Sequence, residues 1–266
     1  MQNIPYPRLI IHPIGTQWCI AINHKPFYQI HLNMKILNYG LFLLCALFIV
    51  SCAQPDGEEA ETGEAGAVAE APATAVNYMV DTEASKVMWE GAKPTGTHKG
   101  YFNLSDGKFA MGDGTIQSGS FTVDMGTLTV TDLKAGEGKE KLEGHLKSGD
   151  FFEVEKFPTA KFEVVEVTKN AEGTEGTHTV KGNLTMHGNT KQITFPATVS
   201  VDGNKLMASS PNFTIDRTDW EISYKSPGIT NVQDNIINDE VGLKIELVAM
   251  KEGTMAAGDN MENEEM

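Results

Sequence analysis

From residue 87 to residue 250 the chain alternates hydrophobic and polar side chains. Phe121, Val123 and Met125 are separated by threonine and aspartate, and the same two-residue period runs through residues 193–201 and 241–249. Successive side chains of a β-strand point to opposite faces, so this pattern predicts strands with one apolar face each. Asp-Gly pairs at residues 106–107 and 113–114 favour tight hairpins between such strands.

We count about eight or nine strands of this kind, which predicts an all-β antiparallel fold. A continuous apolar face is typical of a sandwich or of a closed barrel. Strands of about ten residues joined by hairpins favour the barrel, and a barrel of about eight strands is either filled by side chains or holds one ligand. The connection over residues 216–239 does not alternate, and we expect it to cover one end of the barrel.

One stretch breaks the strand pattern. Residues 141–158 read KLEGHLKSGDFFEVEKFP. Leu142 and Leu146 are four residues apart and share one face of a helix, while Gly149 follows where a helix would end. The stretch therefore predicts a short helix and a turn, with Phe151 and Phe152 sealing one end of the barrel as a plug or a lid.

The segment before the strands has the pattern of an export signal. Residues 34–52 contain Lys35, an apolar run over residues 40–50, and the sequence Ile49-Val50-Ser51-Cys52. This resembles a bacterial lipobox, in which cleavage precedes the cysteine and Cys52 carries diacylglycerol; an ordinary signal peptide or a membrane anchor is the alternative. We expect translation to begin at Met34, with residues 1–33 a mis-assigned upstream extension.

Residues 53–76 are built of Ala, Glu, Gly, Thr and Pro, with an aromatic residue appearing only after them. Such a segment buries too little apolar surface to offset its conformational entropy, so it predicts a disordered acidic tether with a reach of about 25 Å. Residues 251–266 are acidic and poor in apolar side chains, which predicts a disordered tail. The folded domain is therefore expected over residues 77–250.

Charge and cysteine content exclude several classes of function. The net charge is −15, and residues 1–52 contain three basic residues and no acidic one, so all 36 acidic residues follow Cys52. A surface this acidic repels nucleic acid and anionic lipid head groups.

The three cysteines are Cys19, Cys45 and Cys52. Only Cys52 would remain after cleavage, so the domain is expected to lack disulfides and cysteine metal ligands.

The histidines after Cys52 are His98, His145, His178 and His187, and none has a partner at metal-ligand spacing. The chain also has no nucleophile elbow, phosphate-binding loop or paired-carboxylate motif. We therefore expect no metal, no cofactor and no catalytic residue. Position suggests that His187 serves a turn, and that His98 and His145 lie near the barrel rim, where either could contact a polar head group.

Arg217 stands between Asp216 and Asp219 at the end of a strand-like run. One interpretation is an ion pair that holds the long connection in place. The other is an arginine that meets the anionic head of a ligand at the barrel mouth.

Alternation also gives the side chains expected to face inward. The pocket residues predicted from it, together with the two sealing phenylalanines, are Phe121, Val123, Phe151, Phe152, Phe162, Leu184, Phe195, Phe213, Leu243 and Ile245. In a barrel these residues form the core and the wall of any cavity at once, so the pattern leaves a packed interior and a ligand pocket both open.

Four separated blocks carry a family resemblance. They are GSFTVD at residues 119–124, HLKSGDFFEVEKFPTAKF at 145–162, GNLTMHGNTKQITFP at 182–196 and FTIDRTDW at 213–220. In this order they resemble the YceI-like family of exported lipid-binding proteins. The resemblance implies a lipocalin-like antiparallel barrel that holds a long polyisoprenoid chain in an apolar tunnel, for binding, transport or storage without catalysis.

Together these observations predict a lipoprotein of the bacterial cell envelope, facing the periplasm or the cell exterior, whose barrel binds an isoprenoid or another long-chain amphiphile. The sequence is also compatible with a homodimer. A structural or interaction lipoprotein with a solidly packed barrel is the first alternative. A hydrolase or isomerase that uses His145 or His187 with a nearby acid is the second.

Overall fold

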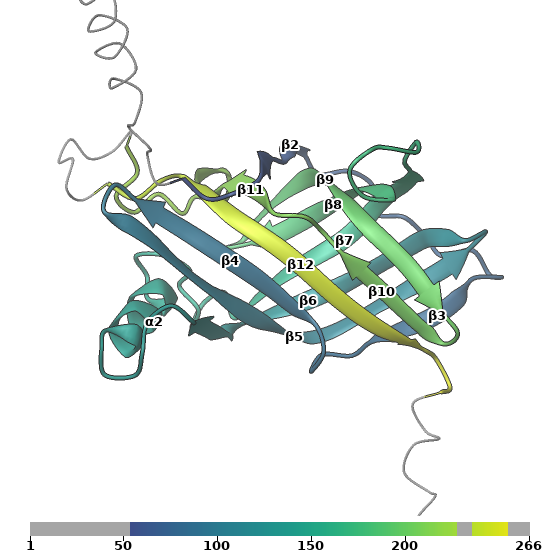
Figure 1. Cartoon of the computed structure of the whole chain (residues 1–266), viewed down its shortest axis with the longest axis horizontal. Coiled ribbons are helices and arrows are strands. Elements are labelled where there is room, and N and C mark those ends of the chain that lie inside the picture. Colours follow the sequence, from purple (N-terminus) through teal and green to yellow (C-terminus); the bar gives the residue numbers. More distant parts are fainter. Residues whose placement is uncertain (1–53, 228–235, 255–266) are drawn as a thin grey trace, which may run out of the picture. The chain divides into compact units, whose positions relative to one another are not determined.

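The computed structural model describes residues 54–227 and 236–254 of the chain, and these residues are mostly strands. Eight strands form a closed ring in which each is antiparallel to the next, and β12 pairs with β4 to complete it (Figure 1). The strands of the ring are β4 (Lys86–Lys93), β5 (Gly96–Gly112), β6 (Thr115–Val130), β7 (Thr159–Lys169), β8 (His178–Met186), β9 (Asn189–Asp202), β10 (Lys205–Ser209) and β12 (Glu240–Lys251). This confirms the predicted antiparallel barrel.

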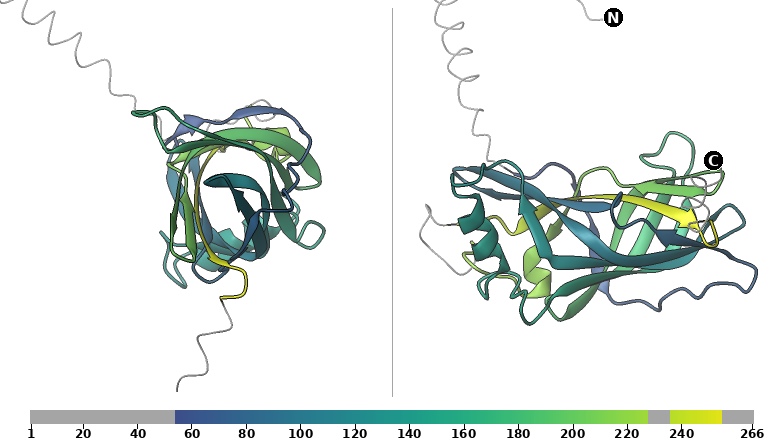
Figure 2. Two further views of the ribbon diagram at one scale, coloured as in Figure 1. Left: turned by 90° about the vertical axis from the view of Figure 1, so that its right-hand side faces the viewer. Right: turned by 90° about the horizontal axis from the view of Figure 1, so that it is seen from below.

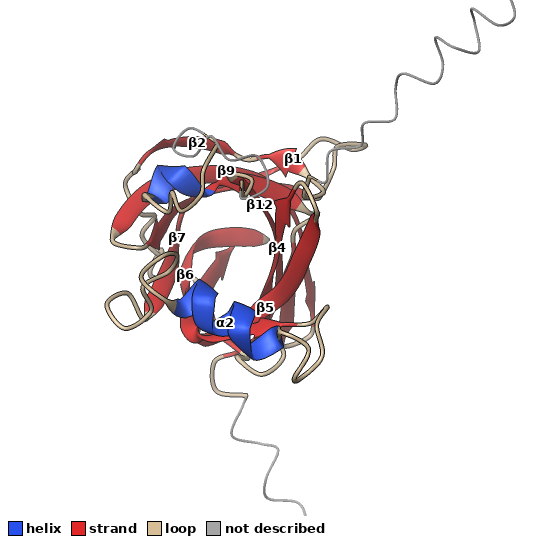
Figure 3. Ribbon diagram, turned by 90° about the vertical axis from the view of Figure 1, so that its left-hand side faces the viewer, coloured by secondary structure: helices blue, strands red, loops and turns tan. Residues whose placement is uncertain are grey.

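Shorter elements lie at the two ends of the ring. The strand β3 (Val76–Val80) pairs with β5 and β12 at one end, which faces the viewer in the left panel of Figure 2. At the other end lie the helix α2 (Lys139–Lys147) and the strand β11 (Phe213–Asp216), which continues into the 3-10 helix η1 (Arg217–Trp220) (Figure 3). We call this second end the α2 end.

The helix α2 forms where the sequence predicted one. Leu142 and Leu146 are partly buried and pack against the barrel core. The helix ends at Lys147, two residues before Gly149, because the Ser148 backbone N–H donates to the His145 carbonyl at 3.1 Å and turns the chain. The turn that follows carries Phe151 into the core, where it is buried.

Two hairpin turns follow the sequence, whereas the hairpin predicted at Asp106-Gly107 is wrong, because this pair lies inside β5 next to a shift in its register with β6. Asp113 and Gly114 both have positive φ between β5 and β6, and His187 and Gly188 have positive φ between β8 and β9. Two consecutive residues of positive φ are the geometry of a type I′ turn, which matches the twist of the strands it joins.

The expectation of a disordered tether over residues 53–76 is not met in the described residues. There, β1 (Glu58–Glu59) pairs with β11 in parallel, and β2 (Glu61–Glu64) pairs with β9 in antiparallel. Between them, Ala60 is only 6% exposed and its N–H donates to the Thr214 carbonyl at 2.8 Å. The segment buries little apolar surface of its own, but it gains order from backbone pairing with the barrel.

The barrel wall supplies hydrogen-bonding partners for the backbone of this segment. The strand β10 pairs with β9 only over residues 198–202, and β11 pairs with β12 but not with β9. An open seam therefore remains between the first half of β9 and β11, and β1 and β2 fill it. Backbone hydrogen bonds to such an edge need no apolar side chains.

Four phenylalanines cross the middle of the barrel interior. The Phe121 and Phe162 rings stack at 5.3 Å between centroids, Phe162 and Phe195 lie at 5.7 Å, and Phe195 and Phe213 stack at 4.6 Å. We call these four residues the phenylalanine layer. Gly182 makes room for it, because a Cβ at this position would lie 2.2 Å from Cζ of Phe162.

The expected signal peptide, the upstream extension and most of the expected tail (residues 255–266) lie outside the described residues. Within residues 54–227 and 236–254, no helix has the length and hydrophobicity needed to cross a membrane.

Candidate ligand-binding site

A cavity of about 350 Å³ occupies the α2 end of the barrel. Its wall is formed by strand residues such as Val87, Trp89 and Val123, which point inward by the alternation seen in the sequence. Leu142 and Leu146 of α2 line it from the end. The lining is dominated by aliphatic and aromatic side chains, so the cavity favours an apolar ligand.

Two phenylalanines and a tyrosine bring the covering segments together. The Phe152 ring meets Phe102 of β5 edge-to-face at 5.8 Å. The Phe151 ring lies 5.3 Å from Tyr224 in the long connection, and His145 contacts both rings at 5.3 and 5.2 Å. The turn after α2 and the connection after η1 thus meet over the cavity, as the sequence predicted for both segments.

None of the four residues of the phenylalanine layer lines this cavity. The layer instead borders a second void of only about 40 Å³. Of the predicted inward residues, the larger cavity is lined by Val123, Phe151, Phe152, Leu184 and Leu243. The small void is lined by Phe121, Phe162, Phe195 and Ile245, while Phe213 is buried and lines neither. All ten residues belong to the core or pack against it, but the expected tunnel is divided into two parts.

Arg217 holds the long connection, which supports the first of our two interpretations. Its side chain is 4% exposed. Its Nε donates to the Asn238 carbonyl at 3.0 Å, and its Nη atoms donate to the carbonyls of Ile222 and Ile237 at 2.5 and 3.1 Å. It also pairs with Asp239 Oδ1 at 2.9 Å. Burial lowers the pKa of Arg217, against the opposing effect of Asp239 and Asp216.

Arg217 also lines the cavity, but most of its N–H groups are already used by the connection. Its structural role is therefore the one that the geometry accounts for, and a contact with a ligand head group stays a prediction.

His98 and His145 both line the cavity, and each is paired with an acid. His98 Nδ1 lies 2.8 Å from Asp132 Oδ2, and His145 Nε2 lies 3.0 Å from Asp150 Oδ2. Burial alone would raise the pKa of Asp132, but hydrogen bonds from the Lys99 backbone and from His98 outweigh it and lower the pKa. In each pair the carboxylate accepts from one ring nitrogen.

Two lysines at the cavity were missed by the sequence reasoning. Lys93, at the end of β4, and Lys225, in the long connection, both belong to the lining. Among the described lining residues none is acidic, although the chain carries 36 acidic residues against 21 basic ones. The charged side chains of the lining are thus basic, while Asp132, Asp150 and Asp239 pair with lining residues from behind. A lysine just before a Pro-Thr-Gly turn was the only signal for Lys93 in the sequence.

The other two histidines lie away from the cavity lining. His187 occupies its predicted turn, with Nδ1 3.1 Å from the Trp220 carbonyl oxygen and its ring 4.6 Å from Phe157. His178 is buried beside Thr177, and this burial lowers its pKa, with a further contribution from Lys169. In the part of the chain that the structure describes, no three His, Cys, Asp or Glu side chains are arranged to hold a metal ion.

Sequence comparison finds relatives of bacterial origin. A UPF0312 protein of Yersinia enterocolitica is 33% identical over 115 residues, which is 42% of this chain and 53% of that protein. A UPF0312 protein of Pseudomonas putida is 37% identical over 92 residues, covering 33% of this chain and 45% of that protein. The chain thus spans about half the length of the curated relatives it matches.

Solved structures give more distant similarities. BcnA of Burkholderia cenocepacia superimposes with a TM-score of 0.49 at 22% identity, over 64% of this chain and 99% of BcnA. A polyisoprenoid-binding domain of Saccharophagus degradans gives a TM-score of 0.47 at 16% identity, over 66% of this chain and 99% of that domain.

The family model of the YceI-like domain matches residues 78–249. This range runs from β3 to β12 and so includes the whole ring of strands, the helix α2 and the cavity. It covers more than half of the chain, and it agrees with the blocks on which the resemblance was based. The chain therefore belongs to the family of YceI-like domain proteins.

Proposed function

We propose that this protein is a lipid-anchored binding protein of the bacterial envelope. In this proposal Cys52 carries the anchor, and the barrel holds the apolar chain of an isoprenoid or a similar long-chain amphiphile for transport or storage, without catalysis. The observation that carries the proposal is the cavity of about 350 Å³, bordered by α2 and the long connection and lined mainly by apolar side chains.

Burial of an apolar chain supplies the binding free energy. Each buried methylene contributes about 0.8 kcal/mol, so the affinity grows with the length of chain inside the cavity. At about 30 Å³ for a water-sized group, a cavity of 350 Å³ holds roughly a dozen such groups. A polyprenyl chain longer than this must leave part of its length at the mouth or displace the phenylalanine layer.

The polar end of the ligand belongs at the mouth. Lys93, Lys225, His98 and His145 all lie around the cavity, and the remainder of its lining offers little to a charged group. A phosphate or carboxylate head would be attracted to the lysines, because opposite charges close to a surface attract. The strand residues that line the cavity, by contrast, are mostly apolar and suit a hydrocarbon chain.

Family membership is consistent with this function but does not define the ligand. The Saccharophagus degradans domain is a polyisoprenoid-binding domain; that ligand class enters here as part of our proposal. The lipobox-like sequence that ends at Cys52 supports the anchor and the envelope location.

The test is to identify what copurifies with the full chain expressed in a bacterial host. Native mass spectrometry and solvent extraction should detect one long-chain amphiphile per barrel. Added polyprenyl phosphate should also change the fluorescence of Trp89, which lines the cavity. A barrel that copurifies empty and takes up neither polyprenyl phosphate nor an isoprenoid quinone would favour the alternative of a packed interaction protein, and the ligand-binding proposal would be withdrawn.

A matched pair of variants connects the ligand to the lid. Phe152→Ala removes a ring that lines the cavity, whereas Phe157→Ala removes a ring that contacts His187 outside the lining. We expect Phe152→Ala to release ligand faster and Phe157→Ala to retain it. Equal retention by both variants would show that Phe152 does not seal the cavity.

A further inference from the structure

The first described residues of the chain are attached to the α2 end of the barrel. Gln54 Nε2 donates to Glu240 Oε2 at 3.3 Å. Pro55 is buried, and its Cβ lies 3.0 Å from the position that a Cβ on Gly242 would occupy. The chain therefore contacts the barrel wall from residue 54 onward.

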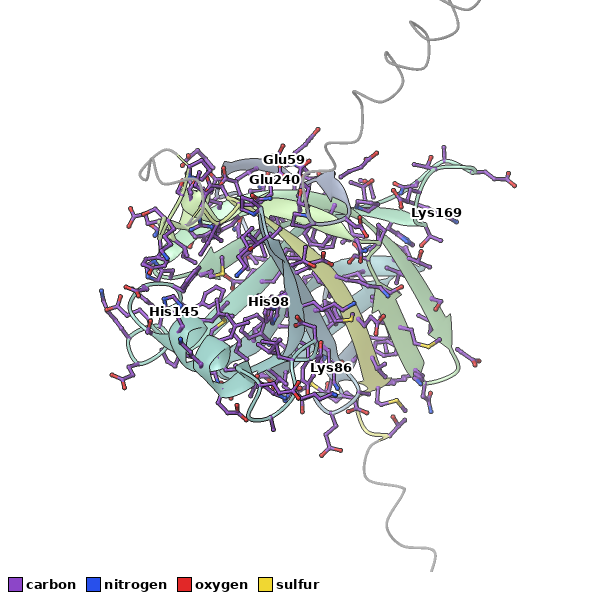
Figure 4. The ribbon with its side chains drawn as sticks, turned by 60° about the vertical axis from the view of Figure 1, so that its left-hand side comes forward. Glu59, Lys86, His98, His145, Lys169 and Glu240 are labelled. Atoms are coloured by element: carbon purple, nitrogen blue, oxygen red, sulfur yellow. The ribbon has the colours of Figure 1, made fainter. Side chains whose placement is uncertain are left out.

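This contact lies at the level of the cavity mouth. Glu240 is the first residue of β12 and comes two residues after Asn238, which lines the cavity. Gly242 pairs with Glu90 of β4, and the next residues of β4, up to Lys93, also line the cavity. In the view of Figure 4, Glu59 and Glu240 both lie at the upper edge of the barrel. Glu59 of β1 pairs with Thr214 of β11, and Thr214 pairs with Gly242 of β12, so β11 separates the two strands.

Further contacts keep the segment in place. Gly57 lies so close to the wall that a Cβ there would be 2.6 Å from the Asn212 backbone. Gly66 and the buried Asn183 exchange two hydrogen bonds of 2.9 and 2.8 Å. The Ala69 N–H donates to the Val164 carbonyl at 2.9 Å. We call residues 54–69 the N-terminal clip; it lies outside residues 78–249, which the family model matches.

The clip leaves almost no free chain after Cys52. Gln54 is only two positions after Cys52, and an extended chain spans at most about 3.6 Å per residue. A lipid attached to Cys52 would therefore be held within about 7 Å of Gln54, instead of at the end of the flexible tether of about 25 Å expected from composition.

We propose that the N-terminal clip holds the mouth of the cavity against the membrane, so that the surface around the mouth is a docking surface for the lipid bilayer. The proposal rests on the proposed anchoring of the chain through Cys52. It has a functional consequence: ligand passes directly between the bilayer and the cavity, and the barrel does not need to search for the membrane. The acidic surface opposes spontaneous docking on anionic lipids, so the anchor and the clip supply the contact.

The two ends of the barrel provide matched positions for a test. Thr95 is exposed in the β4–β5 turn at the mouth, and Asn204 is exposed in the β9–β10 turn at the opposite end. The strand β12 between the ends has 12 residues, which corresponds to about 40 Å along the strand. A quencher at the lipid head groups should therefore reach a label at the first position and not at the second.

For the experiment, p-azidophenylalanine replaces Thr95 or Asn204 and carries a fluorophore. The protein is bound through Cys52 to phosphatidylcholine vesicles that contain a head-group nitroxide lipid. We expect quenching at position 95 to exceed quenching at position 204 by about fivefold or more. A 20-residue Gly-Ser insertion between Ala53 and Gln54 keeps the clip but frees the anchor, and it should make the two positions equal. Equal quenching without the insertion, or stronger quenching at position 204, would overturn the proposal.

The outcome is separable from that of the proposed function. The mass of the full chain isolated from host membranes shows whether Cys52 is acylated. If it is not, the proposed anchor fails, and the same two labels are measured on the chain beginning at Cys52 after coupling of this cysteine to a maleimide lipid. The quenching measured on this lipid-coupled chain tests whether the clip orients the cavity mouth toward the membrane. Ligand extraction independently tests whether the barrel binds lipid.

Discussion

The phenylalanine layer should determine how long a chain the barrel accepts. Phe162 is its central ring, since it contacts both Phe121 and Phe195. Phe162 lines the void of about 40 Å³ and lies two residues after Ala160, which lines the cavity of about 350 Å³. We expect the substitution Phe162→Ala to join the two spaces through the volume that the ring now occupies.

The cost to stability follows from burial and contacts. Replacing a buried Phe by Ala costs about 3–5 kcal/mol, and the cost is greater where the surroundings cannot collapse. Phe162 is only 3% exposed and loses two aromatic contacts, each of about 0.5–1.5 kcal/mol beyond area burial. The strands around it are hydrogen-bonded on both sides, so collapse is limited. We therefore expect a loss of about 4–5 kcal/mol in the free energy of unfolding.

The matched control is Phe109→Ala. Phe109 is 4% exposed and lines the small void from the other side, so it is equally buried but does not separate the two spaces. Urea unfolding measures the stability of both variants. Competition among polyprenyl alcohols of increasing length, followed by native mass spectrometry, measures the preferred chain length.

We expect both variants to lose stability, and only Phe162→Ala to prefer longer chains than the wild type does. If Phe162→Ala keeps the wild-type preference, or if Phe109→Ala shifts it equally, then the phenylalanine layer does not limit the length of the bound chain. A loss of less than about 2 kcal/mol would refute the stability argument, because it would mean that the site collapses freely.

Three further predictions follow from single contacts. Gly182→Ala should cost about 1–3 kcal/mol in urea unfolding, because the new methyl group overlaps the Phe162 ring; an unchanged midpoint would contradict the close contact. Arg217→Met should cost about 3 kcal/mol and raise hydrogen exchange in the long connection, since it leaves three carbonyls and Asp239 without their donor; unaltered exchange would disprove the role of Arg217. Burial lowers the pKa of His178 in the folded state, so the unfolded chain takes up the proton at a higher pH and the wild type should lose stability as the pH falls below about 6.5. Melting temperatures between pH 7.5 and 5.5 should therefore fall less in His178→Gln than in the wild type. Parallel curves for the two proteins would refute this role of His178.

The strands could be predicted from the sequence because the alternation of hydrophobic and polar residues is a local pattern. Each inward position could be identified from its neighbours alone, and every predicted pocket residue is in the core or packs against it. The position of a side chain along the barrel axis, by contrast, cannot be predicted from its neighbours in the sequence. Whether Val123 or Phe121 lies in the larger cavity depends on the register of β6 against β7, and on Gly182 of β8 leaving room for a ring. For this reason the division of the interior could not be predicted.

The helix and the long connection were predictable as interruptions of the strand pattern, but their contacts were not. Lys93 and Lys225 come from segments far apart in the sequence and join one lining only through the pairing of β4 with β12. The N-terminal clip was missed for a related reason. Composition indicates whether a segment can form a core of its own, whereas the open edges of β9 and β11 exist only once the barrel has formed.

The seam that β1 and β2 fill has a practical consequence for where the domain begins. A chain cut at residue 78, the start of the match to the family model, would keep every strand of the ring but leave the β9 and β11 edges unpaired at the mouth. Unpaired strand edges recruit strands from other molecules, so such a chain is expected to form dimers by strand exchange or to aggregate. We therefore expect the smallest self-sufficient unit of this protein to begin with the clip, near residue 54.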